Sequence, residues 1–179
     1  MGQNEGLFEN LDFVLLNDEI LWSVNASWDN PPHQTILKSQ LPREKLTVFL
    51  SRPHSAIWGL KDPRMLLTFE LWKPLLPDNS DVTYVFVHRP LGASILSLAY
   101  RDGLSIERSA QILSPYSENF YRYRYLLQSE KADIVDIYYE SLLEDPKPFV
   151  REINARMGHQ PYHNLELVCH WLMKTLKRF

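Results

Sequence analysis

The sequence predicts an α/β fold in which a parallel β-sheet is flanked by helices to give three layers. Three short segments rich in apolar residues have the character of strands, and segments with apolar residues at helical spacing separate them. Because strands that alternate with helices form parallel βαβ units, these strands should lie in one sheet. A chain of 179 residues fits a single domain with one core. The expected strands are 56–64, 82–87 and 133–139.

The first half of the chain is expected to be mostly helical. Residues 10–24 place leucine, valine and tryptophan at helical spacing, which predicts an amphipathic helix. The stretch 25–34 is dense in Asn, Asp and Pro and predicts a loop, and a second helix is expected over about 42–51. The strand 56–64 ends in charged residues, and 65–76 predicts a helix that stops near two prolines.

The middle of the chain predicts a strand followed by three helices. Residues 82–87 are apolar with almost no alternation, as expected for a strand buried on both faces. A helix is expected over 91–102. Two separate helices are expected over 105–114 and 114–130, each beginning at a serine that can cap its first turn.

The last part of the chain predicts one strand and two helices. The strand is 133–139, and the helix that follows covers 145–158 and ends at Gly158, a residue type that favours helix termination. From about residue 164 the tail is expected to be helical, and it ends in a basic stretch.

Composition excludes several classes of function. The net charge of −3 gives no global electrostatic case for nucleic-acid binding. Cys169 is the single cysteine, so an internal disulfide is impossible and no Cys/His spacing suggests zinc. The apolar runs are far short of the roughly 20 residues that cross a membrane, and the polar N-terminus does not match a secretory signal. These features favour a cytoplasmic protein without a transmembrane segment or a metal.

Each expected strand ends in chemically reactive side chains. Ligands of open parallel sheets bind beyond the carboxyl ends of the strands, where such side chains would gather. The sequence therefore predicts a ligand site at this edge of the sheet. The three strand-end groups are Lys61-Asp62-Pro63-Arg64, His88-Arg89 and Tyr138-Tyr139-Glu140.

The residues after the second strand suggest a phosphate site. Arg89 follows the strand directly, and Pro90 presets the start of a helix whose first amides can face an anion. Ser94, Ser97 and Arg101 are spaced by three and four and share one helix face. A guanidinium binds two phosphate oxygens in a fork, and a serine hydroxyl adds a third bond. The alternative is that Arg89 pairs with a surface carboxylate and the serines are small packing residues.

The first strand end has two interpretations as well. Lys61 can reach a phosphate or sulfonate as a point charge. Asp62 can act as a base, or it can pair with Arg64 or Arg89 in a strand-end salt bridge. His88 is either an acid or base or, as is commoner for a histidine at a strand end, a packing residue.

Five segments, taken in order, resemble the bacterial-type branch of the sulfotransferase family. They cover most of residues 4–158. The resemblance implies one domain over 1–179 with a fold akin to P-loop NTPases, the donor 3′-phosphoadenosine 5′-phosphosulfate (PAPS), and a hydroxyl acceptor on a sugar, lipid or small molecule. The segments are NEGLFENLDFVLLNDEIL, SWDNPP, WGLKDPR, VFVHRPLGASILSLAYRDG and IYYESLLEDPKPFVREINARMG.

The resemblance also implies roles for individual residues. Arg89 and Ser97 match the family's contacts to the 3′-phosphate of the donor, and Lys61 matches the lysine that approaches the 5′-phosphosulfate. Tyr139 falls at the tyrosine near the adenine, and Glu9 is the nearest match to a catalytic base. Asp62 and Arg64 are added from the first strand end. The candidate catalytic residues are then Lys61, Asp62 and Glu9, and the candidate donor-binding residues are Arg89, Ser97, Tyr139 and Arg64.

The sequence departs from the family in one large respect. Family members open with a strand and a loop like R-S-G-T-S that wraps the 5′-phosphosulfate, and the 179 residues contain no match to this loop or to a Walker motif. The resemblance therefore implies an N-terminal truncation relative to the family, and this chain alone is expected to be a weak or inactive enzyme. The alternative is a non-catalytic nucleotide-binding or interaction module that retains only the 3′-phosphate half-site.

Overall fold

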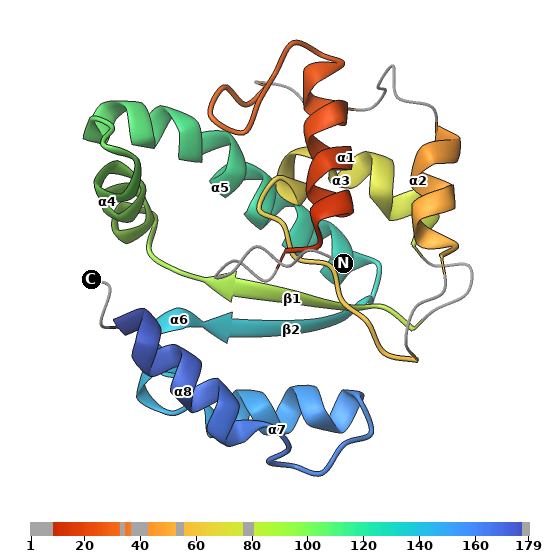
Figure 1. Cartoon of the computed structure of the whole chain (residues 1–179), viewed down its shortest axis with the longest axis vertical. Helices are drawn as coiled ribbons and strands as arrows, with labels where there is room; N and C mark the ends of the chain where they lie inside the picture. Colours follow the sequence, from red (N-terminus) through yellow and green to blue (C-terminus); the bar gives the residue numbers. More distant parts are fainter. Residues whose placement is uncertain (1–8, 33–34, 37–42, 53–55, 77–80, 177–179) are drawn as a thin grey trace. The chain divides into compact units, whose positions relative to one another are not determined.

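The computed structural model describes residues 9–32, 35–36, 43–52, 56–76 and 81–176. Within these ranges the chain is a mixed α/β structure with eight α-helices, one short 3₁₀ helix and a two-stranded parallel sheet. Both strand arrows point the same way in Figure 1. The chain divides into two compact units, which are described separately. The first unit comprises residues 1–83 and 91–133, and the second comprises 84–90 and 134–179.

The first unit begins with three helices that surround an aromatic core. They are α1 (Leu11–Trp22), α2 (Arg43–Leu50) and α3 (Met65–Trp72), and the 3₁₀ helix η1 (Lys73–Leu75) extends α3. All three helices were predicted from the sequence. The side chain of Asn10 caps α1 by accepting a hydrogen bond from the Phe13 amide at 3.1 Å.

Three aromatic rings, one from each helix, form the centre of this core. The Phe13 ring centroid lies 4.9 Å from that of Trp72 and 5.9 Å from that of Phe49. All three side chains are buried, and Phe49 meets Trp72 edge-on. Such tilted and edge-on pairs are favourable beyond the area that they bury. The core therefore fixes α1 against α3, and this contact positions the polar residues described below.

The prediction of a strand over 56–64 was wrong. None of these residues belongs to a strand, and Ile57 and Trp58 are 45% and 37% exposed. The Asp62 carboxylate accepts a hydrogen bond from the Arg64 amide at 2.9 Å, and the Met65 amide donates to the Asp62 carbonyl at 3.0 Å. These local bonds turn the chain into α3 and compete with strand pairing. The sheet consequently contains two strands of the described residues instead of three.

The first unit ends with α4 (Leu91–Asp102) and α5 (Ile106–Ser129), which pack against each other. The helix α4 was predicted correctly, and Ser105 caps α5 as expected by accepting from the Arg108 amide. The predicted break at Ser114 was wrong, because α5 runs through Pro115 as one helix.

A continuous apolar stripe explains why α5 does not break. Ile112, Tyr116, Tyr123 and Leu127 are all buried and recur at helical spacing on both sides of Pro115. Burial of this stripe outweighs the single backbone hydrogen bond that a proline removes. Ser114 does not cap a helix. Its hydroxyl donates a hydrogen bond to the Glu118 carboxylate within α5, at 3.0 Å.

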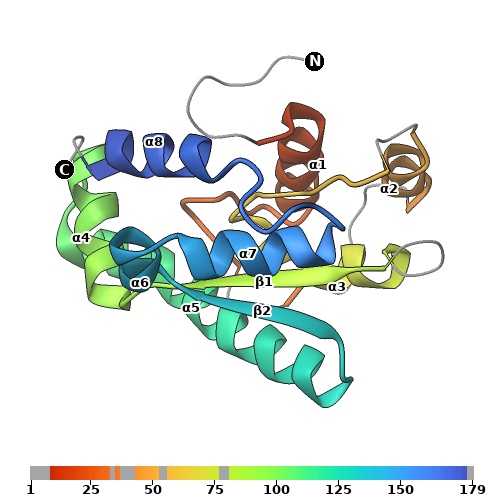
Figure 2. The same cartoon turned by 90° about the horizontal axis from the view of Figure 1, so that it is seen from below.

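The second unit contains the sheet and the last three helices. The strands are β1 (Thr83–His88) and β2 (Asp133–Tyr138), and the helices are α6 (Tyr139–Glu144), α7 (Lys147–Arg156) and α8 (Leu165–Leu176). In both views α7 runs alongside the two strands (Figures 1 and 2). The strands and the last two helices match the sequence-based predictions, except that residue 139 already begins α6. The end of the predicted basic tail, 177–179, lies outside the described residues.

The expectation that the first of these strands is buried on both faces was wrong. Phe86 is 7% exposed, whereas its neighbours Val85 and Val87 are 46% and 47% exposed. Successive side chains of a strand point to opposite faces, so this alternation shows that β1 buries the face that carries Phe86. The remaining buried residues of this unit include Val135 and Ile137 of β2 and Val150 of α7.

Gly158 ends α7 in the left-handed conformation, with φ at +67°. Changing Gly158 to Ala should lower the free energy of unfolding by about 1 kcal/mol, because a Cβ disfavours this conformation. No atom within 4 Å would meet the added methyl group, so the cost comes from the backbone alone. The matched control is Gly92→Ala in the first turn of α4, where the space is equally open and φ is not positive. Chemical denaturation should show no loss for the control, and equal losses for both variants would contradict this explanation.

Candidate functional site

Arg89 and Tyr139, two of the residues predicted to bind the donor, are in contact. Arg89 directly follows β1 and Tyr139 directly follows β2, so the parallel strands bring both to the same edge of the sheet. The guanidinium carbon of Arg89 lies 5.0 Å from the ring centroid of Tyr139. This is a cation–π contact, and it uses none of the five N–H donors of the arginine.

Three further side chains complete a strand-end cluster, defined here as His88, Arg89, Asp136, Tyr138 and Tyr139. His88 Nε2 lies 2.7 Å from Asp136 Oδ1 across the two strands. The imidazole also stacks on the Tyr138 ring, with centroids 4.8 Å apart and planes 19° apart. Tyr138 is itself 59% exposed. The cluster therefore places the Arg89 guanidinium, two tyrosine rings and the His88–Asp136 pair at the carboxyl ends of the two strands.

In the first unit the structure pairs two of the three candidate catalytic residues. Lys61 Nζ lies 2.6 Å from Glu9 Oε1, although the residues are 52 positions apart. The Glu9 side chain is 11% exposed, whereas the Lys61 side chain is 56% exposed.

The charge of Glu9 also raises the pKa of two arginines. Hydrogen bonding to Asp102 is the main cause of the raised pKa of Arg101, and Glu9 contributes to it. Burial lowers the pKa of Arg64, but the charges of Asp62, Asp18 and Glu9 more than offset this.

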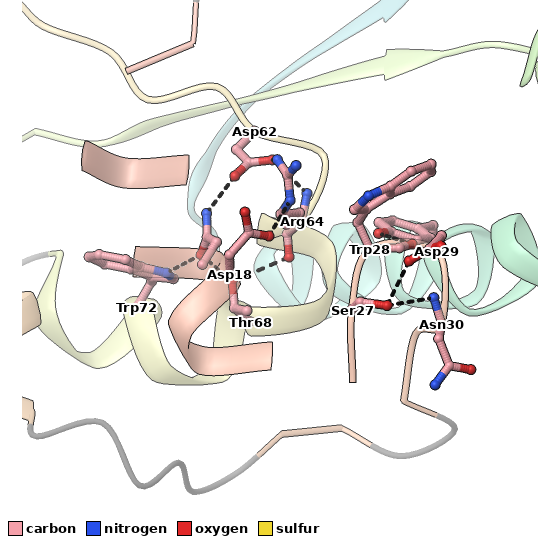
Figure 3. Close-up of polar contacts among 11 residues, drawn as sticks. Asp18, Ser27, Trp28, Asp29, Asn30, Asp62, Arg64, Thr68 and Trp72 are labelled. Carbon is pink, nitrogen blue, oxygen red and sulfur yellow. Dashed lines mark hydrogen bonds and ion pairs between the residues drawn. The ribbon is translucent and has the colours of Figure 1, made fainter. Parts of the chain in front are cut away.

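The third catalytic candidate, Asp62, lies in a buried polar network. Its side chain has no exposed surface. Its Oδ1 accepts hydrogen bonds from the backbone and the guanidinium of Arg64, at 2.9 and 3.0 Å. Its Oδ2 accepts from Asn17 Nδ2 at 2.8 Å. Of the roles open from the sequence, this geometry matches the salt bridge with Arg64 rather than that of a base, since both carboxylate oxygens are engaged within the fold (Figure 3).

The orientation of the Asn17 side chain is fixed by its other two partners. Its Oδ1 accepts hydrogen bonds from Thr68 Oγ1 and from Trp72 Nε1, both at 2.8 Å. An indole N–H only donates, so the amide oxygen must face Trp72 and the amide nitrogen must face residue 62. Position 62 therefore has to supply an acceptor, which a carboxylate does. We call this set the Asn17 network; its members are Asn17, Asp18, Asp62, Arg64, Thr68 and Trp72.

Asp18 is the second carboxylate that contacts Arg64, with Oδ1 2.8 Å from the guanidinium Nε. Burial raises the pKa of Asp18 above its usual value of 3.8, and the charge of Arg64 offsets this only in part. The folded state thus disfavours the charged carboxylate and favours the protonated one. The stability that the protonated Asp18 contributes is fully present below pH 3.8 and is lost as the pH rises through the raised pKa.

Replacing Asp18 with Asn should therefore be tolerated at pH 7. We expect the free energy of unfolding to stay constant or to rise by less than about 1 kcal/mol, because Asn keeps an oxygen for Arg64 and removes the disfavoured charge. The difference between the two proteins should narrow as the pH falls toward 3.8. Denaturant titrations between about pH 3.5 and 7 measure it, and a large loss of stability in the variant at pH 7 would contradict this assignment.

Ser97 and the residues around it lie on α4. Ser94 and Ser97 are half-buried, and both belong to the first unit, whereas Arg89 belongs to the second. A shared phosphate contact of Arg89 and Ser97 stays a prediction. Arg101, on the same helix face, forms a forked ion pair with Asp102, with Nε–Oδ1 at 2.7 Å and Nη2–Oδ2 at 2.8 Å.

Sequence reasoning missed the roles of Asn17, Asp18 and Asp136. A usable signal existed for Asn17, because it lies on the same face of α1 as the buried residues Phe13, Ile20 and Leu21. A polar side chain within an apolar helix face needs a buried partner. The partner itself, 45 residues away, carries no mark in the sequence.

Comparison with known proteins identifies no family for this chain. No protein-family model, curated protein or solved structure matches the chain. In the part of the chain that the structure describes, no three His, Cys, Asp or Glu side chains gather as metal ligands would. The described helices are all too short or too polar to cross a membrane.

Proposed function

We propose that this chain is a sulfotransferase-family protein that transfers a sulfuryl group from PAPS to a hydroxyl of a sugar, lipid or small molecule. The contact between Arg89 and Tyr139 is the observation that most supports it. A nucleotide with a phosphate on its ribose needs a flat apolar surface for its base and a forked cation for that phosphate. The strand-end cluster offers both side by side, at the edge of a parallel sheet where ligands commonly bind.

The donor-binding roles are those that the resemblance implies, and the contact between Arg89 and Tyr139 supports two of them. The Arg89 guanidinium provides the fork for the 3′-phosphate, and Ser97 adds a hydroxyl donor. Tyr139 lies near the adenine and keeps Arg89 in place through the cation–π contact. The three-layer, P-loop-like architecture belongs to this proposal, with β1 and β2 as two neighbouring strands of the larger sheet.

The transfer step is assigned to the first unit. Lys61 is the point charge that stabilises the phosphosulfate, and Glu9 is the base that takes the proton of the acceptor hydroxyl. The hydroxyl oxygen then forms a bond to sulfur, the bond between sulfur and the bridging oxygen breaks, and adenosine 3′,5′-bisphosphate leaves with the electron pair. Preorganised amides contribute roughly 3–4 kcal/mol each to such steps. Because the 179 residues contain no R-S-G-T-S-like loop, transfer by this chain alone should be slow.

A second candidate function is a nucleotide-binding module without catalysis. Two features favour it: the Asp62 carboxylate is used entirely within the fold, and the Glu9 carboxylate is bound to Lys61. Under this alternative the strand-end cluster is the whole functional site. Both candidates bind adenosine 3′,5′-bisphosphate, and they differ only in turnover.

Two measurements separate the candidates. Calorimetric titration with adenosine 3′,5′-bisphosphate tests the shared nucleotide site. Incubation with sulfur-labelled PAPS and a panel of sugar, lipid and phenol acceptors tests transfer. Binding with slow transfer that disappears in Lys61→Ala supports the sulfotransferase. Binding without any transfer supports the module, and absence of binding contradicts both.

A further inference from the structure

The ion pair between Lys61 and Glu9 joins an exposed cation to an enclosed anion. The ammonium lies 2.6 Å from the carboxylate, yet 56% of the lysine side chain is exposed and only 11% of the glutamate side chain is. Solvated lysines at a surface are usually mobile and gain little from pairing. Here the carboxylate is the more enclosed partner, and its bond keeps the ammonium at the surface of the first unit.

Each cation that Glu9 influences already has a carboxylate partner. Arg64 contacts the carboxylates of Asp62 and Asp18, and Arg101 contacts that of Asp102. The carboxylate bound to Lys61 is that of Glu9, which also contributes to the raised pKa of both arginines. Carboxylates therefore outnumber cations in this set of described residues. A phosphate or sulfate group added to the set would meet a negative balance unless one carboxylate moved away.

Glu9 is the carboxylate that can leave at the lowest cost. Asp62 and Asp18 are anchored by the Asn17 network, and Asp102 forms a two-bond fork with its neighbour. Glu9 is held by its bond to Lys61, and its flexible side chain is partly exposed. Exchange of that bond for one to a ligand oxygen preserves the number of charge-assisted bonds on the lysine.

We propose that Glu9 is an internal competitor for the anion position on Lys61, and that a phosphate or sulfate group of the ligand displaces it. The inference rests on the proposed function for the identity of that ligand, the 5′ end of the donor. It assigns the pair an autoinhibitory role. Without an anionic ligand the Glu9 carboxylate occupies the anion position on Lys61, and a bound ligand takes its place.

The test is a cycle of four proteins: wild type, Glu9→Gln, Lys61→Ala and the double variant. Each is titrated with adenosine 3′,5′-bisphosphate and, separately, with inorganic sulfate. Glu9→Gln should tighten binding of both by about three- to tenfold, since it removes a competing charge and keeps the side-chain shape. In the Lys61→Ala background the same substitution should change the affinity by less than about twofold, because the contested cation is gone.

The pair of Lys45 and Glu19 supplies a matched control in the same unit. Its ammonium and carboxylate lie 2.7 Å apart, and its lysine is 54% exposed. Glu19→Gln removes an equal charge and should leave both affinities unchanged. If it tightens binding as much as Glu9→Gln does, the effect is one of net charge and the inference is wrong.

The remaining outcomes distinguish the inference from the proposed function. If the bisphosphate binds and Glu9→Gln leaves its affinity unchanged, the inference fails while the proposed function stands. If sulfate binding tightens in Glu9→Gln through Lys61 but the bisphosphate binds to no variant, the inference holds and the proposed function fails. If neither anion binds any of the four proteins, both are contradicted.

Discussion

Replacing Asp62 with Asn should lower the free energy of unfolding by about 2–4 kcal/mol, although the two side chains have nearly the same shape. The oxygen of the introduced amide can still accept from Arg64, so the nitrogen of that amide must then face Asn17 Nδ2. Two donors would meet where a donor and an acceptor now lie 2.8 Å apart. Asn17 cannot rotate its own amide to help, because its oxygen is held by Thr68 and Trp72.

The reciprocal change supplies a sharp test of this explanation. Asn17→Asp alone should be as harmful, because it places two carboxylates against each other in a buried site. The double variant Asn17→Asp/Asp62→Asn exchanges donor and acceptor, so the hydrogen bond between the two positions can form again. We expect it to recover at least half of the stability that either single change loses.

Urea unfolding of the four proteins measures this coupling. Asp12→Asn is the control, since Asp12 forms an exposed ion pair with Arg52 and its loss should cost less than about 1 kcal/mol. Additive losses in the double variant would contradict the assigned orientation of the Asn17 amide.

Replacing Arg89 with Ala should weaken the binding of adenosine 3′,5′-bisphosphate by about 30- to 5,000-fold, the range expected when a charged partner of a phosphate is removed. Arg89→Lys should give an intermediate loss, because it keeps the charge and loses the fork. The fold should survive, since the contact that Arg89 makes with Tyr139 is worth only about 0.5–1 kcal/mol.

Calorimetry with the purified variants checks this expectation, and a melting curve for each excludes unfolding as the cause. Arg156→Ala is a matched control in the same unit, where the arginine pairs with Glu152 of its own helix. Equal losses of affinity for Arg89→Ala and Arg156→Ala would show that general positive charge, and not the strand-end cluster, attracts the nucleotide.

The parts of the fold that depend on local chemistry were predictable. The caps at Ser105 and Gly158 were placed correctly because each depends on a few adjacent residues. The strands β1 and β2 were found because their β-branched and aromatic residues favour extended backbone. The apolar segment 56–64 resembled them, but the side chain of Asp62 folds back on the chain there, and a strand also needs a neighbour that composition does not reveal.

The candidate site was predictable only where topology brought its residues together. Parallel strands place Arg89 and Tyr139 at one edge, and the general rule for ligands of parallel sheets was enough to relate them. The pairs Asn17–Asp62 and Lys61–Glu9 join residues 45 and 52 positions apart. Their geometry arises from the packing of α1 on α3 and from the turn that precedes α3, neither of which a linear pattern specifies.

We propose that Arg89 recognises a phosphate on the ribose of an adenine nucleotide. The most direct measurement is the ratio of the affinities for adenosine 3′,5′-bisphosphate and adenosine 5′-phosphate, which differ only in that group. The wild-type chain should prefer the bisphosphate by about 30-fold or more, and Arg89→Ala should reduce the ratio to near one. Equal affinities in the wild type, or a preference that survives in Arg89→Ala, would contradict this role of Arg89.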